Sequence, residues 1–154
     1  LMSIHAIKSV GIGVGQLAGT LPGSQVHDEI LAMDDTTPAS GTVPGIVRPT
    51  NRAGGLEGGV TNGEDVRVTA VMKPIATLMK PLRSVDLTTM ADAPATIERS
   101  DVCAVPAAAV VGEAMVAWVL AEAAMEKFGG DTVEDLQAAC AHFLGRVHTR
   151  LTRA

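Results

Sequence analysis

One long apolar run, from Pro106 to Met125, constrains the fold of this 154-residue chain more than any other feature. The run is rich in alanine and is interrupted by Glu113 and Glu122. Alanine is too weakly apolar to drive insertion into a bilayer. A proline in the first turn and Gly129-Gly130 after the last are typical of a helix with defined ends. The run therefore predicts a buried core helix, and no membrane partner is expected.

The composition narrows the class of protein further. With 47% hydrophobic and 19% charged residues, the chain is expected to be globular and to form one domain. Its net charge of −5 and scarcity of aromatic residues exclude a basic or stacking surface for nucleic acid. Cys103 and Cys140 lie in apolar stretches and are predicted to be buried free thiols of a cytoplasmic protein. The four histidines have no metal-ligand spacing, so no metal site is expected.

The region before the apolar run has the pattern of short strands and loops rich in glycine and proline. Apolar and polar residues alternate in Val66–Met72, and strands are expected there, at Val10–Val14 and at Ala95–Ser100. Segments 19–24, 34–45 and 73–82 carry turn residues or paired prolines and are expected to be irregular.

A second helix is expected after the apolar run. Asp131 and Glu134 resemble a capping box, and the helix should extend toward Arg153. Its apolar side has helical spacing and comprises Val133, Leu136, Ala139, Cys140, Phe143 and Val147. The expected fold class is therefore α+β, with strands and Gly- and Pro-rich loops followed by two C-terminal helices.

Two glycine motifs resemble nucleotide-binding loops, and neither fulfils the requirements. Gly13 to Ala18 fits G-x-G-x-x-A, but Gly19 and Pro22 would break the helix that a pyrophosphate site needs. The segment 53–60, AGGLEGGV, lacks the Lys-Ser/Thr of a Walker loop. Its glycines could allow close approach to a flat or anionic ligand, or could simply form sharp turns. From the residues alone these two interpretations are equal.

Most of the basic residues lie between positions 48 and 99, where acidic residues offset their charge. The small net charge argues against a surface for a polyanion. Single cations on these loops could bind a compact phosphate or carboxylate, or could be ordinary solvated charges. The residues concerned are Arg48, Arg52, Arg67, Lys73, Lys80, Arg83 and Arg99.

Three segments resemble the chorismate synthase family: RPTNRAGGLEGGVTNG (48–63), MKPIATLMKPLRSVD (72–86) and ERSDVCAVPAAAVVGEAM (98–115). The similarity runs in unbroken order from LMSIHAIKSV through GSQVHDE to EKFGGD. It implies part of a β-α-β-α sandwich that assembles as a homotetramer. Residues 1–154 correspond to the C-terminal portion of a single chorismate synthase domain. The family's N-terminal histidine motifs, one of the Gly-Glu-Ser-His-Gly type, do not occur in this sequence.

The resemblance implies conversion of 5-enolpyruvylshikimate 3-phosphate to chorismate and phosphate by a 1,4-anti elimination that requires reduced FMN. Asp101 corresponds to the aspartate near flavin N5 and is the expected catalytic residue; Arg99 is expected between the flavin and the substrate phosphate. The expected FMN-binding residues are His5, Ala6, Gly58, Lys73, Pro74, Ile75, Ala76, Thr77 and Arg99.

Some residues depart from the family pattern. GIGVGQ (11–16) lacks the acid and the aromatic residue usual there, and Ala76 and Met79 replace commoner residues of the flavin pocket. Because the histidine motifs are absent, the alternative is a non-catalytic fragment that retains flavin-binding or oligomerisation surfaces. We expect the chain alone to be inactive and to expose apolar faces of helix and sheet, which favours self-association.

Overall fold

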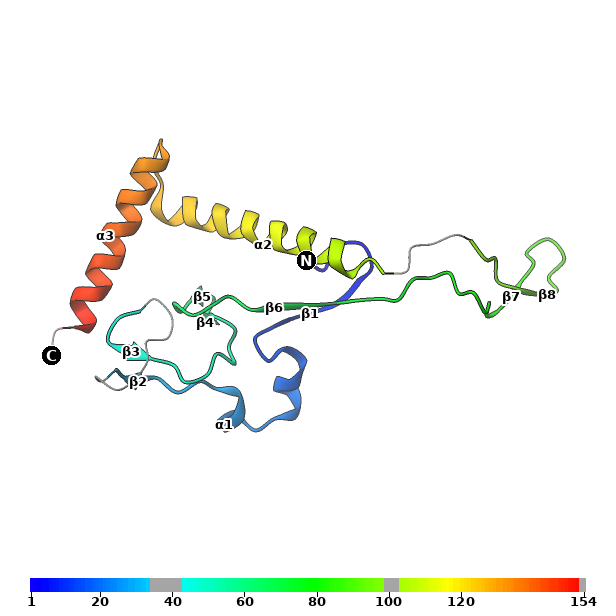
Figure 1. Ribbon diagram of the computed structural model, residues 1–154, viewed down its shortest axis with the longest axis horizontal. Coiled ribbons are helices and arrows are strands. Elements are labelled where there is room, and N and C mark those ends of the chain that lie inside the picture. Colours follow the sequence, from blue (N-terminus) through cyan, green and yellow to red (C-terminus); the bar gives the residue numbers. More distant parts are fainter. Residues whose placement is uncertain (34–42, 99–102, 153–154) are drawn as a thin grey trace.

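The computed structural model describes residues 1–33, 43–98 and 103–152. Short strands and loops come first and two long helices come last, which confirms the predicted α+β class (Figure 1). The elements are β1 (Ile7–Ile12), the 3-10 helix η1 (Gly15–Thr20), α1 (Gly23–Val26), β2 (Leu31–Ala32), β3 (Ile46–Val47), β4 (Leu56–Glu57), β5 (Val60–Thr61), β6 (Val68–Met72), β7 (Arg83–Val85), β8 (Asp92–Pro94), α2 (Val105–Phe128) and α3 (Val133–Leu151).

In the described residues the strands form four separate antiparallel pairs: β1–β6, β2–β3, β4–β5 and β7–β8. The pair β1–β6 joins distant parts of the chain, from Ile7 opposite Met72 to Ile12 opposite Val68. Strand β1 begins and ends earlier than the predicted Val10–Val14. It ends at Ile12 because Gly13 turns at φ 59°, although the Gly13 N–H still donates to the Arg67 carbonyl at 2.9 Å. The β1–β6 ribbon is the frame on which the N-terminal half is organised.

The strand predicted at Ala95–Ser100 is wrong for residues 95–98, which form no strand. The strand of this region is β8, which ends at Pro94 and pairs with β7. The Ala95 N–H closes that hairpin by donating to the Leu82 carbonyl at 2.9 Å. Residues 99 and 100 lie outside the described residues. In Figure 1 the β7–β8 hairpin ends an arm that projects from the rest of the molecule.

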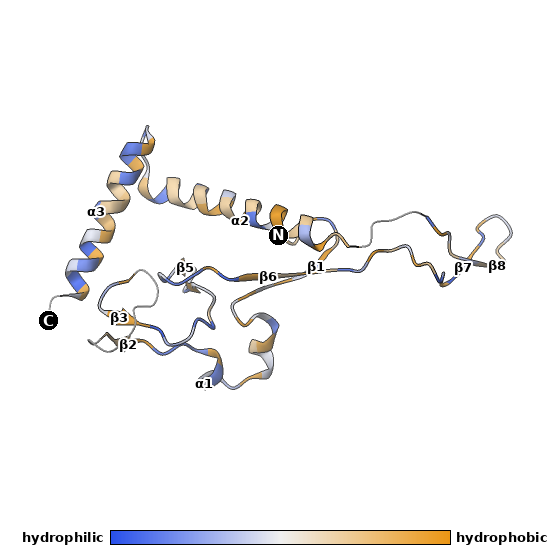
Figure 2. Cartoon of the chain, viewed as in Figure 1, coloured by the Kyte–Doolittle hydropathy of each residue, from blue (hydrophilic) through white to orange (hydrophobic). Residues whose placement is uncertain are grey.

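Helix α2 has the predicted limits. Pro106 lies in its first turn, and Gly129, at φ 63°, ends it by donating to the Met125 carbonyl. The prediction that this helix is buried is wrong for the chain as described, because none of its residues is buried and Trp118 is 65% exposed. The apolar colouring of Figure 2 extends along the helix. Its length and hydropathy would also suffice to cross a membrane, a test that core helices of soluble proteins pass as well.

The predicted burial of Cys103 is also wrong, since this thiol is exposed just before α2, whereas Cys140 is half-buried. The N-cap of helix α3 (Val133–Leu151) lies one residue later than predicted. The cap is Thr132, whose Oγ1 accepts the Asp135 N–H at 3.1 Å, and not Asp131. Helix α3 ends at Leu151, short of the predicted Arg153, which lies outside the described residues.

The predicted apolar side of α3 is confirmed with one exception. Leu136, Ala139, Cys140, Phe143 and Val147 are half-buried, whereas Val133 is 67% exposed. Phe143 packs edge-on against Phe128 of α2, with ring centroids 5.7 Å apart. This aromatic pair fixes the corner between the two helices.

The buried set is small. Among the described residues it comprises Ile7, Val47, Arg48, Gly54 and Gly55, while many large apolar side chains are exposed. The expected exposure of helix and sheet faces is therefore present in the structure.

Candidate functional site

Two segments predicted to contact a flavin meet at one end of the β1–β6 ribbon. The Lys73 N–H donates to the Ala6 carbonyl at 2.8 Å, immediately beyond the pair of Ile7 with Met72. Ala6 has φ 67°, in the left-handed region that residues with a side chain rarely adopt. Such strain persists where surrounding structure holds it, and it is frequent at binding sites. The chain thus places His5-Ala6 beside the start of Lys73–Thr77.

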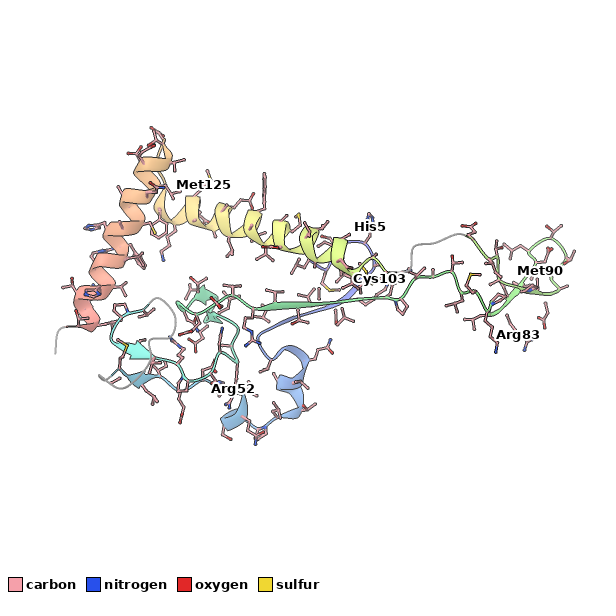
Figure 3. The ribbon with its side chains drawn as sticks, viewed as in Figure 1. His5, Arg52, Arg83, Met90, Cys103 and Met125 are labelled. Carbon is pink, nitrogen blue, oxygen red and sulfur yellow. The ribbon has the colours of Figure 1, made fainter. Side chains whose placement is uncertain are left out.

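The segment after Lys73 is a loop, as predicted, with no regular structure before β7. His5 and Lys73 are exposed, and Ile75 and Thr77 are half-buried. Figure 3 shows His5 and Cys103 near the beginning of α2. An exposed ammonium group and a hydroxyl on one short loop are suited to an anionic group such as a phosphate.

Gly58 lies elsewhere. Gly58 and Gly59, at φ 59° and 80°, form the two-residue turn between β4 and β5. Positive φ at both positions is the requirement of a tight hairpin turn, so the sharp-turn interpretation holds here. Figure 1 shows this hairpin toward the opposite end of the ribbon from the loop that follows β6. Within this chain Gly58 is not brought to Lys73.

A buried arginine holds the Gly58 hairpin. Arg48 is 9% exposed, and its Nη2 lies 3.0 Å from Glu57 Oε2. Its Nη1 donates to the Asn62 carbonyl at 3.3 Å, and Asn62 Nδ2 donates to Glu57 Oε2 at 2.9 Å. Arg48 therefore contacts β4 at Glu57 and the residue that follows β5, Asn62. Of the two interpretations left open by the sequence, ligand cation or solvated charge, it fits neither.

Asp28 clamps the loop before this hairpin. Its Oδ1 accepts from Thr50 Oγ1 at 2.5 Å and from the Arg52 N–H at 2.8 Å, and its Oδ2 accepts from the Ala53 N–H at 2.9 Å. Partial burial acts to raise the pKa of Asp28, but the hydrogen bonds from Thr50, Ala53 and Arg52 and the Arg52 charge outweigh it. They hold that pKa below its ordinary value.

The sequence reasoning did not identify Asp28 as important. The available signal was its place in GSQVHDE, a segment quoted for the family resemblance but given no role. Aspartate readily accepts hydrogen bonds from backbone N–H groups in loops. Asn51 supports the same loop, since its Nδ2 donates to the Asp65 carbonyl and its Oδ1 accepts the Gly55 N–H, both at 2.8 Å.

Glycines permit the backbone segments to touch in this region. A Cβ added to Gly13 would lie 1.9 Å from the Arg52 carbonyl oxygen, and one on Gly54 would lie 2.3 Å from the Gly13 nitrogen. Gly54 thus permits close approach of the chain's own backbone, whereas the predicted close approach was to a ligand and stays a prediction. The segment after Gly13 is a short 3-10 helix, which is not the α-helix that a dinucleotide site requires.

The remaining predicted site residues, Arg99 and Asp101, lie outside the described residues, as does Ser100. In the part that is described, no three His, Cys, Asp or Glu side chains are grouped as a metal site would require.

Comparison with known proteins establishes the family. The family model described as chorismate synthase matches residues 1–125. The chain belongs to the chorismate synthase family. It is 58% identical over 137 residues to chorismate synthase of Geobacter sulfurreducens, covering 89% of this chain and 35% of that relative. It is 55% identical over 144 residues to chorismate synthase of Geotalea daltonii, covering 94% of this chain and 36% of that relative.

A solved structure, described as a crystal structure of chorismate synthase, shares the fold. It has a TM-score of 0.71 and 40% identity over 96% of this chain and 34% of that chain. The predicted family resemblance is therefore confirmed. The chain spans about a third of the length of these chorismate synthases.

Proposed function

We propose that the chain supplies the flavin side of a chorismate synthase, a carbon–oxygen lyase. The proposed reaction converts 5-enolpyruvylshikimate 3-phosphate to chorismate and phosphate by 1,4-anti elimination. The observation that carries the proposal is the hydrogen bond between Lys73 and Ala6 in a chain of this family. The bond joins His5-Ala6 to Lys73–Thr77. The family resemblance implies that each segment contacts FMN, and it implies no contact between the two.

Reduced FMN is the proposed cofactor, and when bound it supplies electron density as phosphate leaves, with no net redox change. The residues beside the Ala6 carbonyl fit its anionic end. The Lys73 ammonium group is exposed, and the Thr77 hydroxyl lies on the same loop. Pro74 restricts that loop, which lowers the entropy lost on binding. Ile75 and Ala76 would contribute backbone groups, and His5-Ala6 a backbone contact.

Gly58 is proposed to contribute its open backbone surface. A Cβ on Gly58 would meet no atom within 4 Å, so a flat ring can approach the turn closely. Gly58 and Lys73 lie apart in this chain, so a single copy in this arrangement does not present both to one flavin (Figure 1).

Two further residues are proposed for the chemistry. The planar guanidinium group of Arg99 suits the charge on the leaving phosphate. Asp101 is proposed to hold a proton near flavin N5 and so assist removal of the C6 hydrogen. We place the protein in the cytoplasm and propose a homo-oligomer, a tetramer as in the family.

The second candidate is a chain that binds flavin without turnover. It is favoured by the coverage, since the chain spans only 35% of a 58% identical relative. For these residues in isolation we expect this behaviour, and we propose the complete reaction for the assembled family protein.

Flavin binding by the chain tests the proposal directly. Oxidised FMN, and FMN reduced under anaerobic conditions, are titrated while flavin fluorescence and absorbance are measured. Lys73→Met should weaken binding about tenfold, since it removes a charge-assisted contact with the phosphate. Lys80→Met is the matched control, because Lys80 is also an exposed lysine followed by proline. Equal affinity of the two variants would remove Lys73 from the proposed site.

The role of Asp101 is tested in a relative that can complete the reaction. The matching aspartate of the Geobacter sulfurreducens chorismate synthase is replaced by asparagine, and chorismate formation and FMN affinity are measured. Turnover should fall by at least about a hundredfold while FMN affinity is retained. Normal turnover would exclude the proton role.

A further inference from the structure

Two arginines line an open cavity of about 610 Å³ at the end of the β1–β6 ribbon where β1 stops. They are Arg52, on the loop before β4, and Arg67, directly before β6. The volume lies within the range of small-ligand sites, about 300–1,000 Å³. Among the described residues no acidic side chain lines the cavity, whose other lining residues are Gly13, Val14, Leu17, Pro49, Thr50 and Asn51.

Arg52 is oriented by the chain itself. Its Nη1 donates to the Ser24 carbonyl at 3.4 Å and to the His27 carbonyl at 3.2 Å. Its backbone N–H donates to Asp28 Oδ1 at 2.8 Å, and its carbonyl accepts the Val14 N–H at 2.8 Å. Within the described part of the chain, Nη2 and Nε of Arg52 donate to no acceptor. A guanidinium group already held at one nitrogen loses less freedom when its remaining N–H groups bind an anion.

Arg67 supplies the second cation. Its backbone is fixed, since its carbonyl accepts the Gly13 N–H at 2.9 Å and its N–H donates to the Gly54 carbonyl at 3.1 Å. Its side chain is exposed and takes part in neither of the ion pairs found between described residues. The Asp28 carboxylate offsets part of the Arg52 charge, which leaves the site cationic. Two cations that line one cavity repel each other, and a doubly charged anion shared between them removes that repulsion.

The cavity also has an apolar wall of Val14, Leu17 and Pro49, and Leu17 is 63% exposed. We propose that the cavity binds a small organic phosphate monoester, whose phosphate contacts Arg52 and Arg67 and whose organic part covers Leu17. A phosphate monoester carries close to two negative charges at pH 7 and suits the fork of a guanidinium group.

This site is separate from the proposed flavin loop. Lys73 follows Met72, which pairs with Ile7 at the other end of the β1–β6 ribbon. Figure 3 shows Arg52 near the position of α1 and apart from His5. The inference therefore needs neither FMN nor turnover.

Nuclear magnetic resonance tests the site. Phenyl phosphate and inorganic phosphate are titrated into the isotope-labelled chain at constant ionic strength, and the arginine Nε–Hε resonances are followed. Saturable shifts are expected at Arg52 and Arg67. Phenyl phosphate should bind at least about threefold more tightly than inorganic phosphate, because its ring can cover Leu17. Arg67→Met should weaken both ligands at least about tenfold, since it removes a charge-assisted contact.

Arg150→Met is the matched control, because Arg150 is an exposed arginine of α3 that does not line the cavity. It should leave the affinity for phenyl phosphate unchanged, and so should Lys73→Met. Protection of the Gly13 amide, which donates to the Arg67 carbonyl, establishes that Arg67→Met keeps the local fold.

Four results would overturn the proposal. The first is no saturable shift at Arg67. The second is equal weakening by Arg67→Met and Arg150→Met, which would be an effect of net charge alone. The third is loss of binding in Lys73→Met, which would place the anion on the flavin loop. The fourth is equal affinity for the two phosphates, which would leave the organic part without a contact. Since no measurement uses FMN, failure here is distinct from failure of the proposed function.

Discussion

The backbone N–H of Lys73 donates a 2.8 Å hydrogen bond to the carbonyl of Ala6. This bond extends the β1–β6 pairing by one step and fixes where the Lys73–Thr77 loop leaves the sheet. A loop that begins at a fixed point loses less conformational freedom when it binds a ligand. The contact therefore links the register of a sheet to the placement of an anion-binding loop.

Removal of the Arg48 guanidinium group should loosen the Gly58 hairpin. Arg48→Met leaves Glu57 and the Asn62 carbonyl without this partner, at a cost of about 1–3 kcal/mol. The Asn62 N–H, which donates to the Gly55 carbonyl at 3.0 Å, is the reporter, and its protection from hydrogen exchange should fall.

Arg83→Met is the control for this prediction. Arg83 also pairs with a carboxylate, that of Asp92, but the two side chains are 87% and 79% exposed. Solvent-exposed pairs contribute little to stability, so protection in the β7–β8 hairpin should be unchanged. An equal loss of protection in both variants would show that burial is not what makes the Arg48 pair matter.

The Asp28 clamp should be sensitive to acid. Because the pKa of Asp28 is lowered in the folded chain, its contribution is complete above the ordinary pKa of 3.8 and is lost as the pH falls from there through the lowered pKa. For this half-exposed group we expect about 1–2 kcal/mol at neutral pH. Asp28→Asn should lose that stability at pH 7 and show little further change between pH 5 and pH 3.

Hydrogen exchange at the Arg52 and Ala53 amides, corrected for the intrinsic effect of pH, measures this directly, because both donate to Asp28. If Asp28→Asn retained the same acid-dependent loss of protection as the unchanged chain, another group would be responsible for it.

Gly13→Ala should be far more damaging than Gly15→Ala. Both glycines have similar positive φ, 59° and 56°, so both variants bear the cost of a left-handed alanine, about 1–2 kcal/mol. Only at Gly13 does the new Cβ also strike backbone, 1.9 Å from the Arg52 oxygen, whereas at Gly15 it meets nothing within 4 Å.

Protection of the Val14 amide, which donates to the Arg52 carbonyl, is the readout for the glycine pair. It should collapse in Gly13→Ala and persist in Gly15→Ala. Similar protection in the two variants would mean that the loops separate without cost, contrary to the packing described.

The parts of the fold that local chemistry determines were predictable. Pro106 and Gly129 set the limits of α2 because a first-turn proline and a left-handed glycine act within one turn of the helix. The cap of α3 was missed by one residue, since Asp131 and Thr132 can both cap and Asp135 is the residue that favours Thr132. Burial of α2 was mispredicted because burial depends on what packs against a helix.

The β7–β8 hairpin could not be predicted from alternation, because its short strands are largely exposed. Its turn depends on Asp86, whose carboxylate accepts the N–H groups of Thr88 and Thr89. For the candidate site, resemblance supplied Ala6 and Lys73 as separate residues. Their contact depends on the register of β1 with β6, which the sequence pattern did not specify.

The division of the described strands into four separate pairs has a consequence for how the chain opens. No strand is shared by two pairs, and although backbone bonds at Gly13, Gly54 and Arg67 join β4–β5 to β1–β6, the β7–β8 pair can be lost without the others. Each hairpin should exchange its amides at its own rate, and heating should produce a succession of local transitions in place of one melting temperature. Cooperativity is then a property that the chain acquires when the open face of α2 is covered.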